Sequence, residues 1–241
     1  MSSLHEEIAN HLTQEILRGQ YRAGERIPSE RDLATRFKAN RGAVREAIKK
    51  VEQLGLAKVQ PGGARVVPIE QASLEVIGHM LAVPEGPDVQ LVDQILEVMN
   101  NLVQLAASAT TRQATDEQIE QLQIKLKQLI NTEPEEKAAY LGARVSLMTA
   151  FMEISDNLAC RIISRSLMLQ LAPQLAPLHS YIRQDHSAAK PELEKMITAL
   201  ASRDSQALTQ AMQVIGNMNR VAVRSAILQA KTPANSLETA S

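Results

Sequence analysis

Hydrophobic residues recur every three or four positions along most of this chain, the spacing that places them on one face of a helix. Near the start, Ile8, Leu12 and Ile16 define such a face over residues 4–17. From about residue 88 the same spacing predicts a succession of longer helices, over residues 88–110, 116–130, 135–155, 158–171, 177–185, 191–202 and 205–230. The pattern therefore predicts a mainly α protein.

Turn and capping residues organise the first part of the chain around two further helices. Ser29 is suited to cap a helix over residues 30–37, and Asn40 a helix over residues 41–54 that Gly55 ends. A turn of three residues separates these two helices, which is typical of a helix-turn-helix.

A β-hairpin is predicted directly after this pair of helices. Two short strand-like runs, residues 56–60 and 64–67, flank the turn Pro61-Gly62-Gly63. A helix-turn-helix with a trailing hairpin is a winged helix-turn-helix. We therefore expect a first domain over residues 1–68, with three helices and a β-hairpin wing.

The remaining residues divide into a linker, a helical body and a tail. Residues 69–87 hold a short helical stretch and end in a Pro-Glu-Gly-Pro break, so they predict a linker. Residues 88–230 predict an all-α bundle of six to seven antiparallel helices. The polar residues 231–241 predict a disordered tail.

Composition agrees with a helical core and limits the compartment. Aromatic residues make up only 2% of the chain, so Leu, Ile, Val, Ala and Met must build the core, as in close-packed helices. The N-terminus has no apolar signal segment, and no stretch approaches the ~18 apolar residues of a membrane span. Cys160 is the single cysteine and cannot form an internal disulfide. We expect a cytoplasmic protein without a membrane segment.

Charge is distributed unevenly between the two domains. Residues 1–68 hold twelve Lys and Arg against eight Asp and Glu, whereas residues 69–241 hold fourteen against nineteen. A basic first domain joined to an acidic body favours a nucleic-acid-binding module attached to a second function.

The sequence lacks the motifs of common enzymes. It contains no glycine-rich phosphate loop, no nucleophile elbow and no pair of carboxylates framed by turns. Cys160 lies on an apolar helix without a neighbouring His, which favours an inert buried thiol. We expect no enzyme activity.

The predicted helix over residues 41–54 carries residues that suit DNA recognition. Arg41 and Arg45 are four residues apart, so one helix face presents both, and Arg side chains can bond bidentately to guanine in the major groove. Arg31, at the start of the preceding helix, can approach the phosphate backbone. The alternative is that these residues only solvate their helices, with Arg31 paired to Asp32 or Glu30 and Arg45 paired to Glu46 or Glu52.

Several motifs over residues 5–68 closely resemble the DNA-binding domain of the GntR family. They are Pro28-Ser-Glu-Arg31, Val44-Arg45-Glu-Ala47, Leu54-Gly55-Leu56 and a glycine-containing wing. The resemblance implies a transcription regulator, a repressor being the commoner kind, that binds a palindromic operator in double-stranded DNA as a homodimer. It assigns DNA contacts to Arg31, Asn40, Arg41, Gly42, Arg45 and the wing-tip Gly62. Gly42 and Pro61 depart from the polar residues usual at their positions, which weakens the side-chain contacts expected there.

The helical body resembles the FCD, or FadR-type, effector domain of this family over about residues 75–230. The similar segments are Leu91-Val-Asp-Gln-Ile-Leu-Glu-Val98, Leu105-Ala-Ala107, Glu153-Ile-Ser-Asp-Asn157 and Ala199-Leu-Ala-Ser-Arg-Asp204. Such domains are antiparallel bundles that dimerise, and many bind a metal and a carboxylate metabolite. The resemblance implies that residues 88–230 form the effector-binding and dimerisation domain.

The metal ligands of that family are replaced in this sequence. Counted from Asn157 and Asp204, their four positions fall on Arg144, Met148, Leu193 and Ile215. These side chains cannot build a divalent-metal site, so we expect no metal and no other cofactor. The remaining His residues lack ligand spacing, and His179 and His186 are expected at the surface or an interface.

Tyr140, Arg144 and Met148 lie at four-residue spacing and suggest a different chemistry for the pocket. Arg can anchor a carboxylate, Tyr can donate a hydrogen bond and Met can form an adaptable apolar wall. We expect a small carboxylate or acyl-type effector. The alternative places Met148 in an ordinary core and Arg144 at the surface, paired with an acid such as Glu136.

Two questions stay open at the level of sequence. Asn100, Asn101, Asn217 and Asn219 interrupt apolar helices and could face either the cavity or a dimer interface. The alternative function is a helical adaptor whose winged domain contacts protein; such a domain does not need Arg41 and Arg45 together on one face.

Overall fold

The computed structural model describes residues 3–83, 86–132, 136–183 and 185–231. The chain forms two compact units, one that runs to Val83 and one that follows it. Each unit is described by itself.

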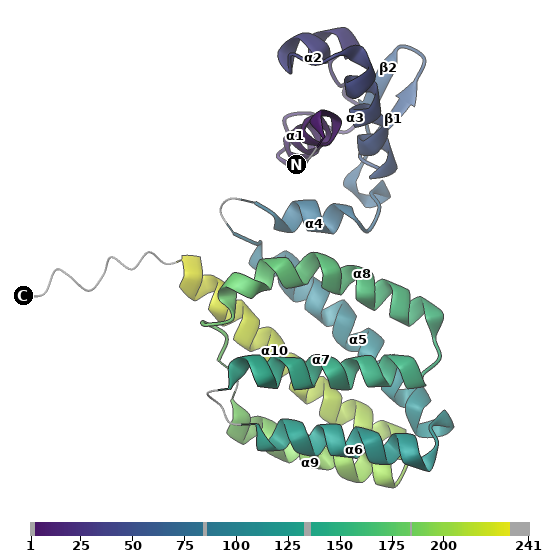
Figure 1. The fold of residues 1–241 in the computed structure, drawn as a ribbon, viewed down its shortest axis with the longest axis vertical. Coiled ribbons are helices and arrows are strands. Elements are labelled where there is room, and N and C mark those ends of the chain that lie inside the picture. The colour runs from purple at the N-terminus through teal and green to yellow at the C-terminus, as the bar shows by residue number, and fades with distance from the viewer. Residues whose placement is uncertain (1–2, 84–85, 133–135, 184, 232–241) are drawn as a thin grey trace, which may run out of the picture. The chain divides into compact units, whose positions relative to one another are not determined.

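The first unit begins with three helices and a hairpin (Figure 1). Its elements are α1 (Leu4–Leu17), α2 (Glu30–Arg36), α3 (Arg41–Gln53), β1 (Ala57–Gln60), β2 (Gly63–Val66), the short 3-10 helix η1 (Ile69–Gln71) and α4 (Val76–Leu81). The two strands are antiparallel, with Ala57 opposite Val66 and Gln60 opposite Gly63. The predicted winged helix-turn-helix is confirmed.

The expected caps start both helices of the helix-turn-helix. The backbone N–H of Asp32 donates to Ser29 Oγ at 3.3 Å, and that of Ala43 donates to Asn40 Oδ1 at 2.8 Å. Gly55 ends the third helix with a φ of 71°. A Cβ there would lie 2.6 Å from the carbonyl oxygen of Gln71, so both the backbone angle and the close approach require glycine.

Residues 69–83 belong to the first unit, although the sequence suggests a linker over residues 69–87. Val76 is buried in the same apolar core as Leu12 and Val44. The side chain of Gln14 on α1 donates a hydrogen bond of 3.0 Å to the carbonyl of His79 on α4. The helix α4 is thus fastened to α1 by a buried side chain and a hydrogen bond.

The second unit is a bundle of long helices. They are α5 (Val89–Gln113), α6 (Asp116–Asn131), α7 (Lys137–Ile154), α8 (Leu158–Leu175), α9 (His186–Ala201) and α10 (Ser205–Lys231), with a short 3-10 helix η2 (Ala176–Leu178) after α8. The helix α10 packs along α5, and α6 packs against both α7 and α9 (Figure 1). Buried Leu, Ile, Val, Ala and Met side chains form most of the core, as the composition predicts. None of the helices in the described segments has the length and apolar character that a membrane crossing requires.

Two predicted helices near residue 185 differ from the structure. In place of a helix over residues 177–185, the described residues form the 3-10 turn η2 and then irregular backbone. The helix expected to begin at Pro191 begins at His186, because Asp185 Oδ1 accepts a hydrogen bond of 3.0 Å from the backbone of Ala188. Pro191 lies inside this helix, so the hydrogen bond that a backbone N–H there would donate to the Ser187 carbonyl is missing. In the predicted tail, residues 232–241 lie outside the described residues.

Candidate nucleic-acid interface and ligand pocket

Helix α3 is divided into a buried face and a basic exposed face. Val44, Ala47 and Val51 are fully buried in the core of the first unit. Arg41 and Arg45 are exposed on the other side. The helix therefore presents both guanidinium groups to solvent on a rigid support, which is the arrangement a recognition helix needs.

Arg45 is held by an acid that lies outside its own helix. Its Nε and Nη2 atoms donate to the two carboxylate oxygens of Glu30, at 3.1 and 2.9 Å. This hydrogen bond lowers the pKa of the Glu30 carboxyl. The acids expected from the sequence are engaged elsewhere, since Glu46 pairs with Lys49 and Glu52 accepts the backbone N–H of Val59. Because the Arg45 side chain is 61% exposed, this pair is weak enough to open for another anion.

Arg31 and Arg41 are more accessible than Arg45. The Arg31 side chain is 78% exposed and its Nε lies 3.8 Å from a carboxylate oxygen of Asp32, one of the two partners expected for it. Arg41 makes no side-chain hydrogen bond or ion pair with the described part of the chain. Both can approach an external anion without first breaking a strong internal contact.

The three remaining residues assigned to DNA contact lie at the start of α3 and at the wing tip. The side-chain oxygen of Asn40 is occupied as the helix cap, so its amide NH2 is the group left to contact an external acceptor. A Cβ on Gly42 would lie 3.2 Å from that oxygen, so glycine leaves room for the cap. Gly62, with a φ of 97°, is exposed and would have open space around a Cβ.

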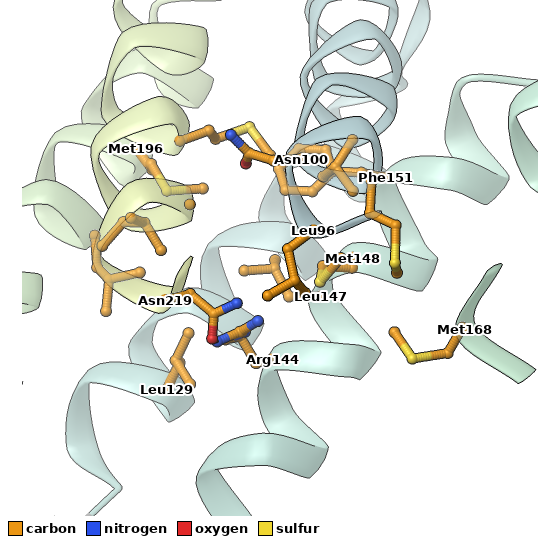
Figure 2. Close-up of a pocket in the computed structure, with 16 residues that line it drawn as sticks. Leu96, Asn100, Leu129, Arg144, Leu147, Met148, Phe151, Met168, Met196 and Asn219 are labelled. Atoms are coloured by element: carbon orange, nitrogen blue, oxygen red, sulfur yellow. The ribbon is translucent and has the colours of Figure 1, made fainter. Parts of the chain in front are cut away.

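The second unit encloses a cavity of about 100 Å³ between its helices (Figure 2). Most of its wall is apolar, and five of the lining residues are methionines: Met99, Met148, Met168, Met196 and Met212. Its polar side chains are Asn100 on α5, Arg144 on α7 and Asn219 on α10. The cavity thus combines an adaptable apolar wall with a small number of polar groups, as ligand pockets do.

Arg144 places a positive charge in this cavity. Its Nη1 donates to the side-chain oxygen of Asn219, and the two side chains lie together in Figure 2. No carboxylate of the described residues forms an ion pair with it; in particular, Glu136 does not. Burial lowers the pKa of the Arg144 guanidinium, although an Arg side chain remains charged in proteins. An unbalanced cation in apolar surroundings attracts an anion.

Of the three residues predicted to line the pocket from one helix, Arg144 and Met148 line the cavity, whereas Tyr140 lies outside its wall. The Tyr140 ring is buried and meets the edge of the His186 ring, with 4.5 Å between their centroids. Its hydroxyl has no hydrogen-bond partner among the described residues, and burial raises its pKa. His186 therefore packs against the bundle rather than standing free at the surface.

Asn100 and Asn219 are two of the four asparagines that, from the sequence, could face either the cavity or a dimer interface. Both line the cavity. Asn101 instead donates to the carbonyl of Glu97 on its own helix, at 2.9 Å. The sequence did not identify the methionines as residues that line a cavity, because methionines at helical spacing are ordinary core residues.

Comparison with known proteins supports both units independently. Residues 4–67 match the family described as bacterial regulatory proteins, gntR family, and residues 94–216 match the FCD domain. The chain belongs to the GntR family and carries an FCD domain. It is a DNA-binding transcriptional regulator of the FCD type.

Named relatives of this GntR/FCD regulator span most of its length. The HTH-type transcriptional regulator Mce2R of Mycobacterium tuberculosis is 27% identical over 215 residues, 88% of each chain. The HTH-type transcriptional repressor NanR of Citrobacter rodentium is 28% identical over 222 residues, 87% of this chain and 81% of the relative. Among solved structures, the chain shares its fold with Lar, which is described as controlling the expression of the agr system of Listeria monocytogenes. The two match with a TM-score of 0.54 and 14% sequence identity, over 92% of this chain and 97% of Lar.

The four positions at which the family resemblance led us to expect metal ligands lie together on the wall of the cavity of this GntR/FCD regulator. Arg144, Met148, Leu193 and Ile215 all line it, from α7, α9 and α10. An Arg, a thioether and two aliphatic side chains do not fit a divalent metal, which prefers imidazole and carboxylate ligands. Within the described ranges, no three His, Cys, Asp or Glu side chains gather where they could hold a metal ion.

Proposed function

We propose that this regulator binds a palindromic operator as a homodimer, represses transcription from it, and responds to a small organic anion that enters the cavity without a metal. The single observation that carries the effector proposal is Arg144, a half-buried cation on the cavity wall whose hydrogen-bond partner is a neutral amide. A carboxylate could bond bidentately to its guanidinium and balance its charge.

The DNA-binding part of the proposal rests on α3 and the wing. Arg41 and Arg45 would read base edges in the major groove, with Arg31 on the phosphate backbone. Asn40, Gly42 and Gly62 would contribute through an amide group and through close approach of the backbone. The exposure of the three Arg side chains supports these roles.

A dimer is supported by exposed apolar residues on the second unit. Val214, Val221 and Leu228 follow each other at intervals of seven on α10, and all three are exposed. Val98 and Leu105, on the neighbouring α5, show the same spacing and exposure. A seven-residue repeat marks one seam of a helix, the kind of surface that packs against a partner helix. Two copies joined here would offer two recognition helices to a palindrome.

Response to the effector requires that the anion bind the DNA-competent and DNA-incompetent arrangements with different affinity. An anion on Arg144 would compete with Asn219, which lies on α10 near Arg220. Arg220 is in turn bonded to Asp93 and Glu97 on α5, with a shortest distance of 2.6 Å. Displacement of Asn219 from Arg144 by an anion would therefore affect the contact between α5 and α10.

The DNA proposal is tested by selection from a pool of random duplexes. The wild-type protein is expected to enrich a palindromic sequence, with affinity that falls steeply with salt, and the double variant Arg41→Ala, Arg45→Ala is expected to enrich nothing. The variant Arg112→Ala, Arg183→Ala removes the same charge from the second unit and should behave as wild type. If all three proteins select no sequence, the adaptor function replaces the operator-binding proposal.

A further inference from the structure

The cavity contains a second polar group that the Arg144 site does not use. Asn100 on α5 lines the cavity, and in Figure 2 it lies apart from the Arg144 and Asn219 pair. Its side-chain amide makes no hydrogen bond with any described residue. Asn100 is half-buried, and its side chain faces the cavity, where a ligand atom can bond to the amide.

Gly216 on α10 makes room for this amide. A Cβ at Gly216 would collide with the oxygen, carbon and nitrogen of the Asn100 amide group. Any other residue there would push the amide out of its place. Glycine at this position therefore allows the Asn100 amide to lie against α10.

The two polar groups of the cavity are separated by a short distance along α10. Gly216, beside Asn100, and Asn219, bonded to Arg144, are three residues apart on the same helix. Three residues of an α-helix span about 4.5 Å. Asn100 and Arg144 thus meet α10 about one helical turn apart.

The volume of the cavity agrees with a short ligand. At about 100 Å³, it is smaller than the ~300–1,000 Å³ pockets that hold drug-sized ligands. A straight-chain acid of four to six carbons with one additional oxygen is therefore the size of ligand to test. The methionine side chains and Phe151 would contact its methylene groups.

We propose that Asn100 determines specificity, selecting a short organic acid that carries a second hydrogen-bonding oxygen, a hydroxyl or a carbonyl, over the plain alkanoate of the same length. This inference rests on the proposed anion site at Arg144. The carboxylate binds the guanidinium, and the distal oxygen bonds to the Asn100 amide. An alkanoate leaves that amide unpaired, and the resulting penalty discriminates against it.

The test uses matched pairs of ligands: butanoate with 4-hydroxybutanoate, and hexanoate with 6-hydroxyhexanoate. Dissociation constants are measured by calorimetry for the wild type, Asn100→Leu and the control Asn101→Leu, whose amide bonds to its own helix. For at least one pair, the wild type and Asn101→Leu should bind the hydroxy acid at least about tenfold more tightly than the alkanoate. Asn100→Leu should bind both within about twofold. Circular dichroism of each variant confirms that it is folded.

Two kinds of failure are distinguishable. If the wild type binds the alkanoates as tightly as the hydroxy acids, or if Asn100→Leu keeps the preference, the role of Asn100 is wrong while the anion site stands. Loss of all binding in Arg144→Gln would then still support that site. If the wild type binds none of the four acids at 10 mM, roughly the limit of weak specific binding, both the anion site and the inference built on it are wrong.

Discussion

Replacement of Arg144 by Met should abolish anion binding while leaving the unliganded protein folded, with a stability close to that of the wild type. The guanidinium is half-buried in a mostly apolar cavity wall and bonds to an amide rather than to a carboxylate. Apolar replacement of buried ionic groups is often neutral or stabilising by ~1–4 kcal/mol. The lost hydrogen bond from Arg144 to Asn219 opposes this gain by about 1–3 kcal/mol.

The difference between these two ranges places the free energy of unfolding between about 2 kcal/mol lower and about 3 kcal/mol higher than that of the wild type. For a chain of this size, that corresponds to a Tm between roughly 4–8 °C lower and roughly 6–12 °C higher. Thermal denaturation followed by circular dichroism measures it. Adding 6-hydroxyhexanoate should raise the Tm of the wild type and leave that of Arg144→Met unchanged, because a ligand stabilises only the protein that binds it.

Arg165→Met is the matched control, since Arg165 is exposed on α8. Its stability should change by no more than about 0.5 kcal/mol, as for most surface substitutions. A loss of about 3 kcal/mol or more in unliganded Arg144→Met would refute the reasoning. Such a loss would show that Arg144 is a structural residue whose polar contacts outweigh its desolvation.

Three further predictions concern the first unit and the dimer. Glu30→Gln removes the ion pair that holds Arg45, and it should tighten operator binding, measured by fluorescence anisotropy, about two- to fivefold, the strength of an exposed ion pair. Glu117→Gln is the neutral control. Weaker binding by Glu30→Gln would mean that Glu30 orients Arg45 for DNA. Val221→Lys should dissociate the dimer in analytical ultracentrifugation, whereas an unchanged mass would place the interface elsewhere. A hydrogen bond from the backbone N–H of Ser3 and, second in size, the interaction with Lys50 lower the pKa of the Glu6 carboxyl from 4.5 to about 2. The contribution of Glu6 to stability is therefore complete above pH 4.5 and is lost as the pH falls toward 2. Glu6→Gln should make the free energy of unfolding less dependent on pH in that window, and an unaltered pH dependence would contradict this role.

The first unit was predictable from sequence because its signals are local. Ser29, Asn40 and Gly55 mark helix ends through their own side chains or backbone angles, and each lies at the end it predicts. The pairing of Arg45 could not be predicted in this way. Its partner Glu30 is fifteen residues away on another helix, and only the packing of α2 against α3 brings the two together.

Proline gave a misleading signal in the second unit. Pro177 and Pro191 each suit the first turn of a helix, so the sequence predicts helices that begin there. In the structure, Asp185 supplies a stronger start, and α9 continues through Pro191. Here the cap sets the boundary because the Asp185 carboxylate accepts the backbone N–H of Ala188, which would otherwise be unpaired at the start of the helix.

The set Tyr140, Arg144 and Met148 shows that residues four apart on one helix need not all line the same small cavity. The α7 residues that line the cavity run from Arg144 to Phe151. Tyr140 precedes Arg144 by one turn, about 6 Å along the helix, and its ring meets that of His186 instead. The polar character of the pocket is therefore set by residues that meet from different helices, Asn100 and Asn219 with Arg144. Its ligand must be inferred from those contacts rather than from one helix.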